Sequence, residues 1–470
     1  MSEIDRRRFL TGSMMVAAGA GLSGSLGSLL SRSLAGASVR QQPAESKYGP
    51  LIPTRPTSVA AGVDGEVEWL SLPKGFEYAV FGVAGSPMTD GKITPNAHDG
   101  MGCFKGKKGR VRLVRNHEVR DGAGAAAPLD AAKSYDPMSA GGTTTLEIAF
   151  DRDGIPSVTR DFVSLSGTHT NCAGGITPWK SWLTCEETTV GTPEFSANHG
   201  YVFEVPAAAN GPVDPEPLTA LGRFTHEAAC VDPRTGVVYM TEDAGDSGFY
   251  RFVPTRKGRL DAGRLQMLQV KGTDGYDTRT GQTVGTALPV EWLDITEPDP
   301  PAGGKAVYEE GIAGGAAIFR RAEGTVFDDG RIFFTATDGG DARHGQVWSY
   351  RPKGAAGGTL TLVFESPDPA ILSFPDNLVV SPRGGIVLCE DTSRVLAGRA
   401  TSDQFLKGLS ADGVVFDFAL NLVDSKEWAG TCWSPDGDYL FANTLAEQFA
   451  NDDPKSRTYA IWGPWSRGDL

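Results

Sequence analysis

Short apolar segments alternate with polar residues along this chain, and they come in pairs separated by a turn. Residues 168–188 show the unit, with an apolar run, the turn Thr177-Pro178-Trp179 and a second apolar run. A period of two and an enrichment in β-branched and aromatic residues predict β-strands, and the turn between two strands predicts a hairpin. The first and last residues of such a hairpin lie side by side at its open end.

The same pattern occurs six times in the sequence. Its copies lie at residues 103–118, 172–187, 227–242, 323–338, 376–391 and 428–443, so each spans fifteen positions. The middle of each copy carries a turn signal, such as Asp-Asp-Gly at 328–330. Antiparallel units repeated in this way are typical of radial all-β folds. We therefore expect an all-β, six-bladed β-propeller with inserted loops and short helices, formed by residues 38–470 as a single domain.

The segments between the repeats predict the rest of this fold. Residues 141–151 and 457–465 each read as one strand, 38–75 as an N-terminal arm, and 257–301 and 397–409 as insertions. Propellers avoid open sheet edges by pairing strands from the two ends of the chain. We therefore expect the C-terminal strand to complete a blade that is built mostly from other parts of the sequence.

Acidic residues recur at the open ends of the predicted hairpins. Those that we expect to bind metal are Glu118, Glu187, Glu227, Glu242, Glu323, Asp376 and Glu390. Equivalent ends of propeller blades point toward one axis, so these side chains are expected to converge. Converging carboxylates repel one another and are costly to desolvate, so a ring of them implies bound cations. The alternative is a set of acids that flank turns on a solvated rim, which the repeated register disfavours.

Cys172 differs from the other five cysteines of the chain. It begins its hairpin at the place that Glu227, Glu323 and Asp376 occupy in other copies. The remaining cysteines lie in strand-like segments, where cysteine is commonly a small buried core residue. A thiol at a place that is otherwise acidic makes Cys172 a candidate metal ligand.

Residues 1–37 predict an export signal rather than part of the fold. Arg6-Arg7-Arg8 is followed by a Gly/Ala-rich apolar segment, and Ala35-Gly36-Ala37 provides small residues for cleavage. The apolar segment is too rich in Gly and Ser for a stable membrane span. We expect the twin-arginine export machinery to be a partner, no stable membrane anchor after processing, and a periplasmic or extracellular location.

The charge of the chain excludes one class of partner. Loss of residues 1–37 removes four arginines and two acids, so the net charge moves from −14 to −16. A protein this acidic has no electrostatic basis for binding nucleic acid or an anionic membrane surface.

Several motifs together resemble one known family. T-N-C-A-G-G-x-T-P-W with W-L-T-C-E-E, F-T-H-E-A-A with Y-M-T-E-D and F-Y-R-F-V-P, and S-P-R-G-G-I-V-L-C-E-D resemble the PhoX family of secreted alkaline phosphatases. The resemblance spans about residues 90–465 and implies hydrolysis of phosphate monoesters at an iron–calcium cluster on the axis of a six-bladed propeller. By position, Cys172 resembles the thiolate ligand of iron, and Glu187, Glu242 and Glu323 resemble cluster carboxylates. Arg321 resembles the arginine that binds phosphate.

The chemistry of the candidate residues agrees with the Fe³⁺ and Ca²⁺ that this resemblance implies. Calcium takes about six to eight hard oxygen ligands, which a ring of carboxylates can provide. One thiolate among carboxylates is unsuited to calcium and indicates a transition metal at the same site. Such a cluster suits phosphoryl transfer, with Cys172, Glu187 and Arg321 as the expected catalytic residues and phosphate esters as substrates.

Two other functions remain open on the sequence alone. A propeller lactonase or esterase would use one calcium ion to polarise a carbonyl group, but it would need neither Cys172 nor Arg321. A calcium-stabilised binding propeller without catalysis would also have six blades and an acidic axis.

Overall fold

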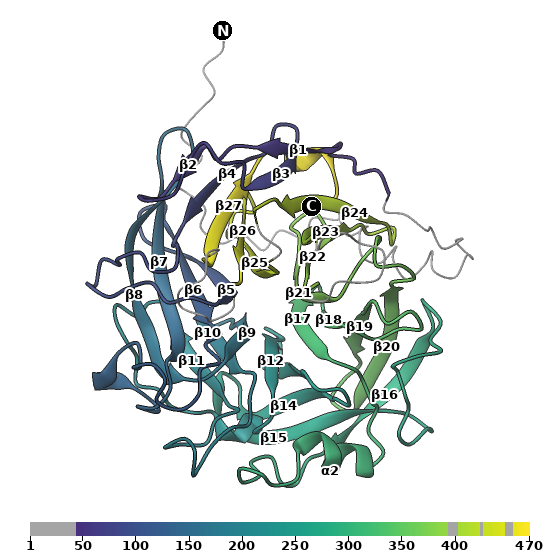
Figure 1. Ribbon diagram of the computed structural model, residues 1–470. Coiled ribbons are helices and arrows are strands. Elements are labelled where there is room, and N and C mark those ends of the chain that lie inside the picture. Colours follow the sequence, from purple (N-terminus) through teal and green to yellow (C-terminus); the bar gives the residue numbers. More distant parts are fainter. Residues whose placement is uncertain (1–43, 393–402, 424–425, 447–454) are drawn as a thin grey trace.

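The structure is a computed structural model that describes residues 44–392, 403–423, 426–446 and 455–470. The export signal expected at residues 1–37 lies outside the described residues. Strands dominate the described part of the chain and surround a central axis in a propeller-like arrangement (Figure 1). The expectation of an all-β, propeller-like fold is confirmed. None of the helices in the described ranges is long and apolar enough to cross a membrane.

Each of the six sequence repeats folds as an antiparallel hairpin. The first strands, here called inner strands, are β5 (His98–Lys105), β9 (Asn171–Ile176), β12 (His226–Val231), β17 (Ala322–Asp328), β21 (Pro375–Val380) and β25 (Trp428–Trp433). The second strands are β6 (Val111–His117), β10 (Ser181–Glu186), β13 (Val238–Glu242), β18 (Arg331–Ala336), β22 (Ile386–Glu390) and β26 (Tyr439–Thr444). The hairpin expected to start at Cys103 instead starts at His98, because β5 is longer than the other inner strands.

The inner strands form a closed ring in which each contacts the next, and β25 contacts β5 (Figure 1). They enclose an axial channel of about 380 Å³. Glycine makes the close approach possible. A Cβ on Gly175 of β9 would lie 1.7 Å from the carbonyl oxygen of Ala229 in β12, and a Cβ on Gly324 of β17 would lie 2.6 Å from that of Asp376 in β21. Glycines of the inner strands therefore set how closely the hairpins pack around the axis.

Further strands extend the hairpins outward. β7 (Gly141–Phe150) and β8 (Pro156–Thr168) complete a four-stranded sheet with β5 and β6, and β11 (Val202–Pro206) completes a three-stranded sheet with β9 and β10. A nine-stranded sheet holds two hairpins, because β16 (Ala287–Asp294) pairs with both β15 (Arg259–Val270) and β20 (Gly357–Glu365). β14 (Phe249–Arg256) and β19 (Gln346–Pro352) belong to the same sheet.

The segment expected as an insertion at 257–301 therefore holds two strands of a sheet. The backbone N–H and C=O groups of these two strands pair with those of neighbouring strands, so the segment is not a separate loop. Because β16 joins two hairpins in one sheet, the described residues form five hydrogen-bonded sheets, which together contain the six inner strands.

Strands from the two ends of the chain close the ring, as expected. β27 (Arg457–Trp462) pairs with β26 and with β4 (Glu77–Phe81), and β2 (Ser58–Val59) pairs with β4. On the neighbouring sheet, β3 (Leu70–Pro73) pairs with β1 (Leu51–Thr54) and with β24 (Val415–Asn421), which follows β23 (Phe405–Leu409). The N-terminal arm is thus part of two sheets, and β23 is a regular strand at the end of the segment expected as an insertion at 397–409.

Helices are few and short, and apolar side chains fill the space between the sheets. The helix α2 (Val307–Ala313) and the 3-10 turns η2 (Ala131–Lys133) and η3 (Thr219–Leu221) lie in connections, and the 3-10 turn η4 (Trp465–Arg467) follows the last strand. Phe249 of β14 stacks on Phe334 of β18 with their ring centroids 4.2 Å apart. Aromatic packing of this kind joins the two halves of the nine-stranded sheet.

Candidate metal centre

The open ends of the six hairpins share one register. In each hairpin, the last pair of hydrogen-bonded residues at the open end, such as His226 and Glu242, is separated from the rest of the ladder by a register shift. We call the next residue of the inner strand the inner position and the residue after the second strand the outer position. The inner positions hold Asp99, Cys172, Glu227, Glu323, Asp376 and Ala429. The outer positions hold Glu118, Glu187, Asp243, Thr337, Asp391 and Leu445.

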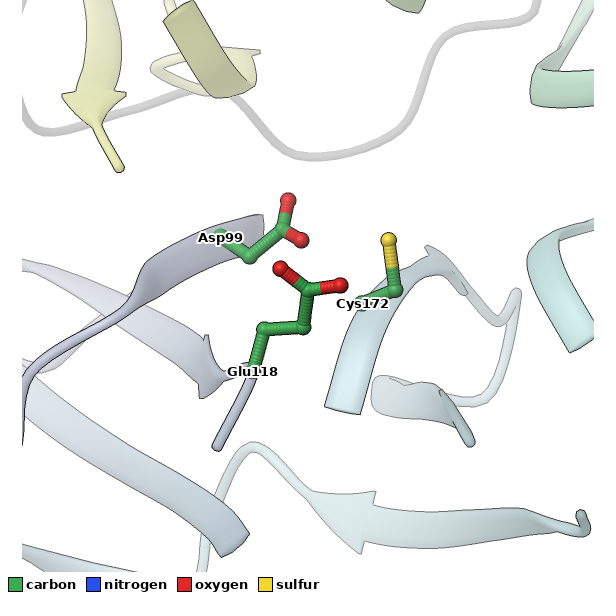
Figure 2. Close-up of side chains that lie close together, drawn as sticks. All are labelled: Asp99, Glu118 and Cys172. Atoms are coloured by element: carbon green, nitrogen blue, oxygen red, sulfur yellow. The ribbon is translucent and has the colours of Figure 1, made fainter. Parts of the chain in front are cut away.

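Side chains from these positions meet at the axis. Ligand atoms of Asp99, Glu118 and Cys172 lie within 4.8 Å of one another, and Figure 2 shows the three side chains pointing toward one another from β5, the end of β6 and β9. Ligand atoms of Cys172, Glu187 and Glu227 also lie within 4.8 Å of one another. The Cys172 Sγ is 3.0 Å from Oε2 of Glu227. The thiol therefore belongs to both groups.

The sixth hairpin contributes its acid differently. Its inner and outer positions are the apolar Ala429 and Leu445. Glu427, two residues before Ala429, interacts electrostatically with Asp391 and Asp376. The carboxylate that completes the ring therefore comes from the residues that lead into β25.

Burial and mutual repulsion disfavour the charged forms of these groups. Burial, followed by the charge of Asp376, raises the pKa of Asp99 to about 8. Burial also raises the pKa of Glu118 and of Asp376, each to about 7. The pKa values of Glu187, Glu227, Glu323 and Glu427 are raised well above the usual value for the same reasons. Burial and the charge of Asp99 raise the pKa of the Cys172 thiol strongly.

Two arginines link neighbouring hairpins across these acids. Nη2 of Arg120 donates to Glu118 and, at 2.6 Å, to Glu187. Nε of Arg321 lies 3.0 Å from Oδ1 of Asp243, and its Nη2 lies 2.6 Å from Oε1 of Glu323. The Glu323 carboxylate and then Asp243 raise the pKa of Arg321, which keeps the guanidinium charged.

The backbone of Arg321 is held in an unusual conformation. Its φ is 44°, in the left-handed region that non-glycine residues rarely adopt. Its N–H donates to the carbonyl of Ala244, and its own carbonyl accepts from the N–H of Thr337. Strain of this kind is maintained at functional sites by the surrounding structure.

The donor set fits bound cations. Among the residues that the structure describes, two guanidinium groups face nine carboxylates, which leaves seven negative charges if all ionise. The nine are Asp99, Glu118, Glu187, Glu227, Asp243, Glu323, Asp376, Asp391 and Glu427. Buried oxygens of Asp99, Glu227 and Asp391 have no hydrogen-bond partner within the described ranges. Bound cations would satisfy both the charge and these oxygens. A set of hard oxygens with one soft sulfur fits calcium together with a transition metal.

Glu242 does not join this group, which corrects the expectation from the fifteen-residue spacing. Its Oε2 accepts the N–H of Gly248 and the hydroxyl of Tyr250, the latter at 2.6 Å. Burial raises its pKa to about 8. The hairpin is one residue longer than the spacing implies, so the next residue, Asp243, takes the outer position.

Glu390 is corrected in the same way. Its carboxylate accepts the N–H groups of Ser373, just before β21, at 2.8 Å and of Phe405 in β23 at 3.3 Å. Asp391 takes the outer position. Glu186 behaves alike, because it accepts the N–H groups of His169 and Gly200 while Glu187 is directed to the group of acids. In each of the three pairs of consecutive acids, the first acid therefore accepts hydrogen bonds within its own blade, and the second acid is directed to the axis.

The structure brings together most of the residues expected from the sequence and adds others. Glu118, Cys172, Glu187, Glu227, Arg321, Glu323 and Asp376 all lie in the connected group. The group also includes Asp99, Asp243, Asp391, Glu427 and Arg120, none of which was among the expected metal ligands. A signal existed for Asp391, since fifteen positions from Asp376 lead to it rather than to Glu390.

Comparisons with known proteins bear on the family and the fold of the chain. The sequence profile of the family described as Alkaline phosphatase PhoX matches residues 48–446. No curated protein sequence matches the chain. Among solved structures, the chain is similar to Pseudomonas fluorescens PhoX in complex with vanadate, a transition state analogue, with a TM-score of 0.65 and 18% identity over 92% of this chain and 99% of that one.

A putative 6-phosphogluconolactonase from Bacteroides uniformis is also similar, at a TM-score of 0.37 and 12% identity over 75% of this chain and 81% of that one. That similarity is too low to bear on function. The family profile covers most of the described chain, including all residues of the connected group. The chain therefore belongs to the PhoX family of alkaline phosphatases.

Proposed function

We propose that this phosphatase hydrolyses phosphate monoesters at an iron–calcium cluster held by the inner and outer positions of its hairpins. The observation that carries the proposal is the convergence of nine carboxylates, one thiol and two guanidinium groups at the open ends of the inner strands. No single metal ion requires so many anionic ligands, so more than one ion is expected. The thiol of Cys172 is the group that calls for iron beside calcium.

The ligands divide between the two metals by chemistry. Cys172, together with the nearby carboxylates of Asp99, Glu118, Glu187 and Glu227, would hold iron. The remaining acids, from Asp243 to Glu427 in the connected group, would hold calcium through oxygen atoms alone. When bound, the cluster would stabilise negative charge on the phosphoryl group.

Arg321 is the expected contact to the substrate. Its Nε and Nη2 are engaged by Asp243 and Glu323, which fixes the plane of the guanidinium beside the acids. The side chain is 29% exposed, whereas that of Glu323 is 2% exposed. The guanidinium can therefore donate to phosphoryl oxygens from the solvent side of the centre, where bidentate contacts favour the transition state.

Three further features belong to the same proposal. The six inner strands and their partners are counted as six blades, two of which share the nine-stranded sheet. Residues 38–470 form one domain, and residues 1–37 direct export by the twin-arginine machinery to the periplasm or the cell exterior. That route transports folded proteins, which agrees with a chain whose centre would be metal-loaded before export.

Metal analysis and a phosphatase assay test the proposal together. The purified protein should contain iron and calcium, and it should hydrolyse an aryl phosphate at alkaline pH with loss of activity in chelator. Calcium without iron would reject the assignment of Cys172. Activity that survives complete metal removal would reject the metal centre itself. Hydrolysis of an aryl lactone in preference to the phosphate would instead support the lactonase alternative.

A further inference from the structure

Arg120 carries an inference that goes beyond the proposed arginine Arg321. It lies two residues after the outer position Glu118, at the end of the first hairpin. Its Nη2 donates to Glu118 of its own hairpin and to Glu187 of the next one. Both contacts use the same nitrogen. Nε and Nη1, which carry three N–H groups, make no hydrogen bond within the described part of the chain.

The backbone holds Arg120 in this place. The carbonyl of Val119 accepts the N–H of Thr170, and the carbonyl of Thr170 accepts the N–H of Glu187. The backbone of Thr170 therefore joins the segment around Arg120 to the segment around Glu187. Thr170 itself has a φ of 50°, so this connection is a defined local structure and not an extended strand.

The guanidinium lies between the acids and solvent. The side chain of Arg120 is 55% exposed, while those of Glu118 and Glu187 are 6% and 9% exposed. A substrate that approaches these buried acids from solvent meets the guanidinium first. A simple counter-charge for the two acids would not need free N–H groups on the solvent side.

Arg120 and Arg321 are arranged alike. Each guanidinium bridges acids from two neighbouring hairpins, Glu118 and Glu187 in one case and Asp243 and Glu323 in the other. The two pairs are adjacent, because Thr225 forms an isolated β-bridge with Glu187 and its carbonyl accepts the N–H of Asp243. Two guanidinium groups on either side of these acids can each donate to the oxygens of one phosphoryl group.

We propose that Arg120 is a second phosphate-binding residue, which contacts the phosphoryl group opposite Arg321. The inference rests on the proposed function, since it assumes that phosphate binds at this centre. Arg120 would use Nε and Nη1 for phosphate and keep Nη2 on the two acids. A lysine would retain the charge but would lose this division of donors.

The test compares Arg120→Ala and Arg120→Lys with the wild type and with Arg234→Ala. Arg234 is a matched control, because it is 61% exposed and bound to Asp232 in the turn at the other end of a hairpin. Binding of inorganic phosphate to the metal-loaded proteins is measured by calorimetry, together with metal content and the kinetics of aryl phosphate hydrolysis. The dissociation constant should rise about 10-fold or more in Arg120→Ala, and to a smaller extent in Arg120→Lys, as loss of charge-assisted donors implies. Metal content should stay the same in both Arg120 variants. The Arg234→Ala variant should bind phosphate with the same dissociation constant as the wild type.

Each other outcome counts against the inference. Unchanged phosphate affinity in metal-loaded Arg120→Ala would show that Arg120 only neutralises the acids. If Arg120→Ala loses metal, the phosphate affinity of Arg120→Lys is the deciding measurement. A lysine variant with full metal content and unchanged affinity for phosphate would overturn the proposal. Loss of metal in both variants would assign Arg120 to holding the metal ligands instead. Failure of the wild type to bind phosphate would reject the proposed function together with this inference.

Discussion

At the scale of single residues, Cys172 is the side chain whose chemistry distinguishes this centre from a calcium site. Its thiol occupies an inner position that is acidic in four of the other five hairpins. Burial and neighbouring acids raise its pKa strongly, so the thiolate that metal binding requires is not stable there by itself. A bound metal ion is the interaction that would stabilise the thiolate.

Replacement of Cys172 by alanine should therefore remove iron and activity together. The purified Cys172→Ala variant should contain less iron than the wild type by at least several-fold and should show no turnover, because loss of a metal ligand typically costs far more than substrate affinity. Metal analysis and an aryl phosphate assay measure both. Cys432→Ala is the control, since Cys432 is a buried thiol of the apolar core around β5 and β25. A Cys172→Ala variant with full iron content and activity would contradict the assignment.

Replacement of Arg321 should reduce activity without loss of metal. Arg321→Ala leaves the acidic ligands in place, so metal content should be retained, while kcat/KM should fall by on the order of 10²-fold or more because a transition-state contact is lost. Inhibition by free phosphate should weaken in parallel. The measurement is a full kinetic comparison on metal-loaded protein. Unchanged inhibition by phosphate would assign the contact to another residue.

Residue-level expectations from the sequence were right about where acids gather and wrong about which of two adjacent acids faces the axis. Glu242 and Glu390 were expected at the centre, but Asp243 and Asp391 take the outer positions. Strand alternation does not settle this choice, because both residues lie at the point where pairing ends and a register shift occurs. Asp99 was missed because the length of β5 was not apparent from the spacing of the other repeats.

At the scale of elements, the three pairs of consecutive acids hold the ends of β10, β13 and β22 in place and direct their outer positions. Glu242 accepts the hydroxyl of Tyr250 and the N–H of Gly248, both in or next to β14. The following residue, Asp243, is engaged by Arg321. The first acid thus fixes the end of β13, and that end carries the second acid to the axis.

This division predicts different effects for two adjacent substitutions. Glu242→Ala leaves the buried hydroxyl of Tyr250 without its acceptor and should lower the free energy of unfolding by about 1–3 kcal/mol, even in metal-free protein. Asp243→Asn should change the stability of metal-free protein little, but it should reduce calcium affinity and turnover. Thermal unfolding in chelator and calcium titration separate the two effects. Equal effects of both changes in chelator would refute the division of roles.

The hairpins were predictable as elements because each combines two apolar runs with a turn signal. The strands that complete the sheets were harder to assign. β15 and β16 lie in a segment expected as an insertion, and β1 to β3 lie in one expected as an arm. These segments carry no copy of the repeat, and only tertiary pairing with strands far away in sequence makes them regular.

At the scale of the whole molecule, the ring of hairpins places like charges where they oppose folding. All six inner strands contribute to one narrow ring, so their acids cannot move apart without separating the sheets. The closure by β27 and β4 then joins the two ends of the chain around the same axis. Metal ions bound at the centre would connect different hairpins, and their binding free energy would appear as stability of the entire fold.

This coupling predicts opposite pH dependences with and without metal. In metal-free protein the pKa of Asp99 rises from 3.8 to about 8, that of Asp376 from 3.8 to about 7 and that of Glu118 from 4.5 to about 7. Between the usual and the raised values the folded protein binds more protons than the unfolded chain, so the free energy of unfolding falls as pH rises through this window. With iron and calcium bound, the ionised carboxylates are ligands, and stability should not fall over the same range.

Thermal unfolding at several pH values between about pH 5 and pH 8, in chelator and in the metal-loaded protein, measures this difference. The Tm in chelator should decrease with pH, and the Tm of the metal-loaded protein should stay constant or increase, so that the two curves diverge toward alkaline pH. Asp376→Asn removes one titrating acid and should flatten the curve in chelator. The curve of the metal-loaded variant should lie below that of the wild type, because a calcium ligand is lost. Parallel curves for wild type in the two conditions would mean that the acids at the axis do not bind metal.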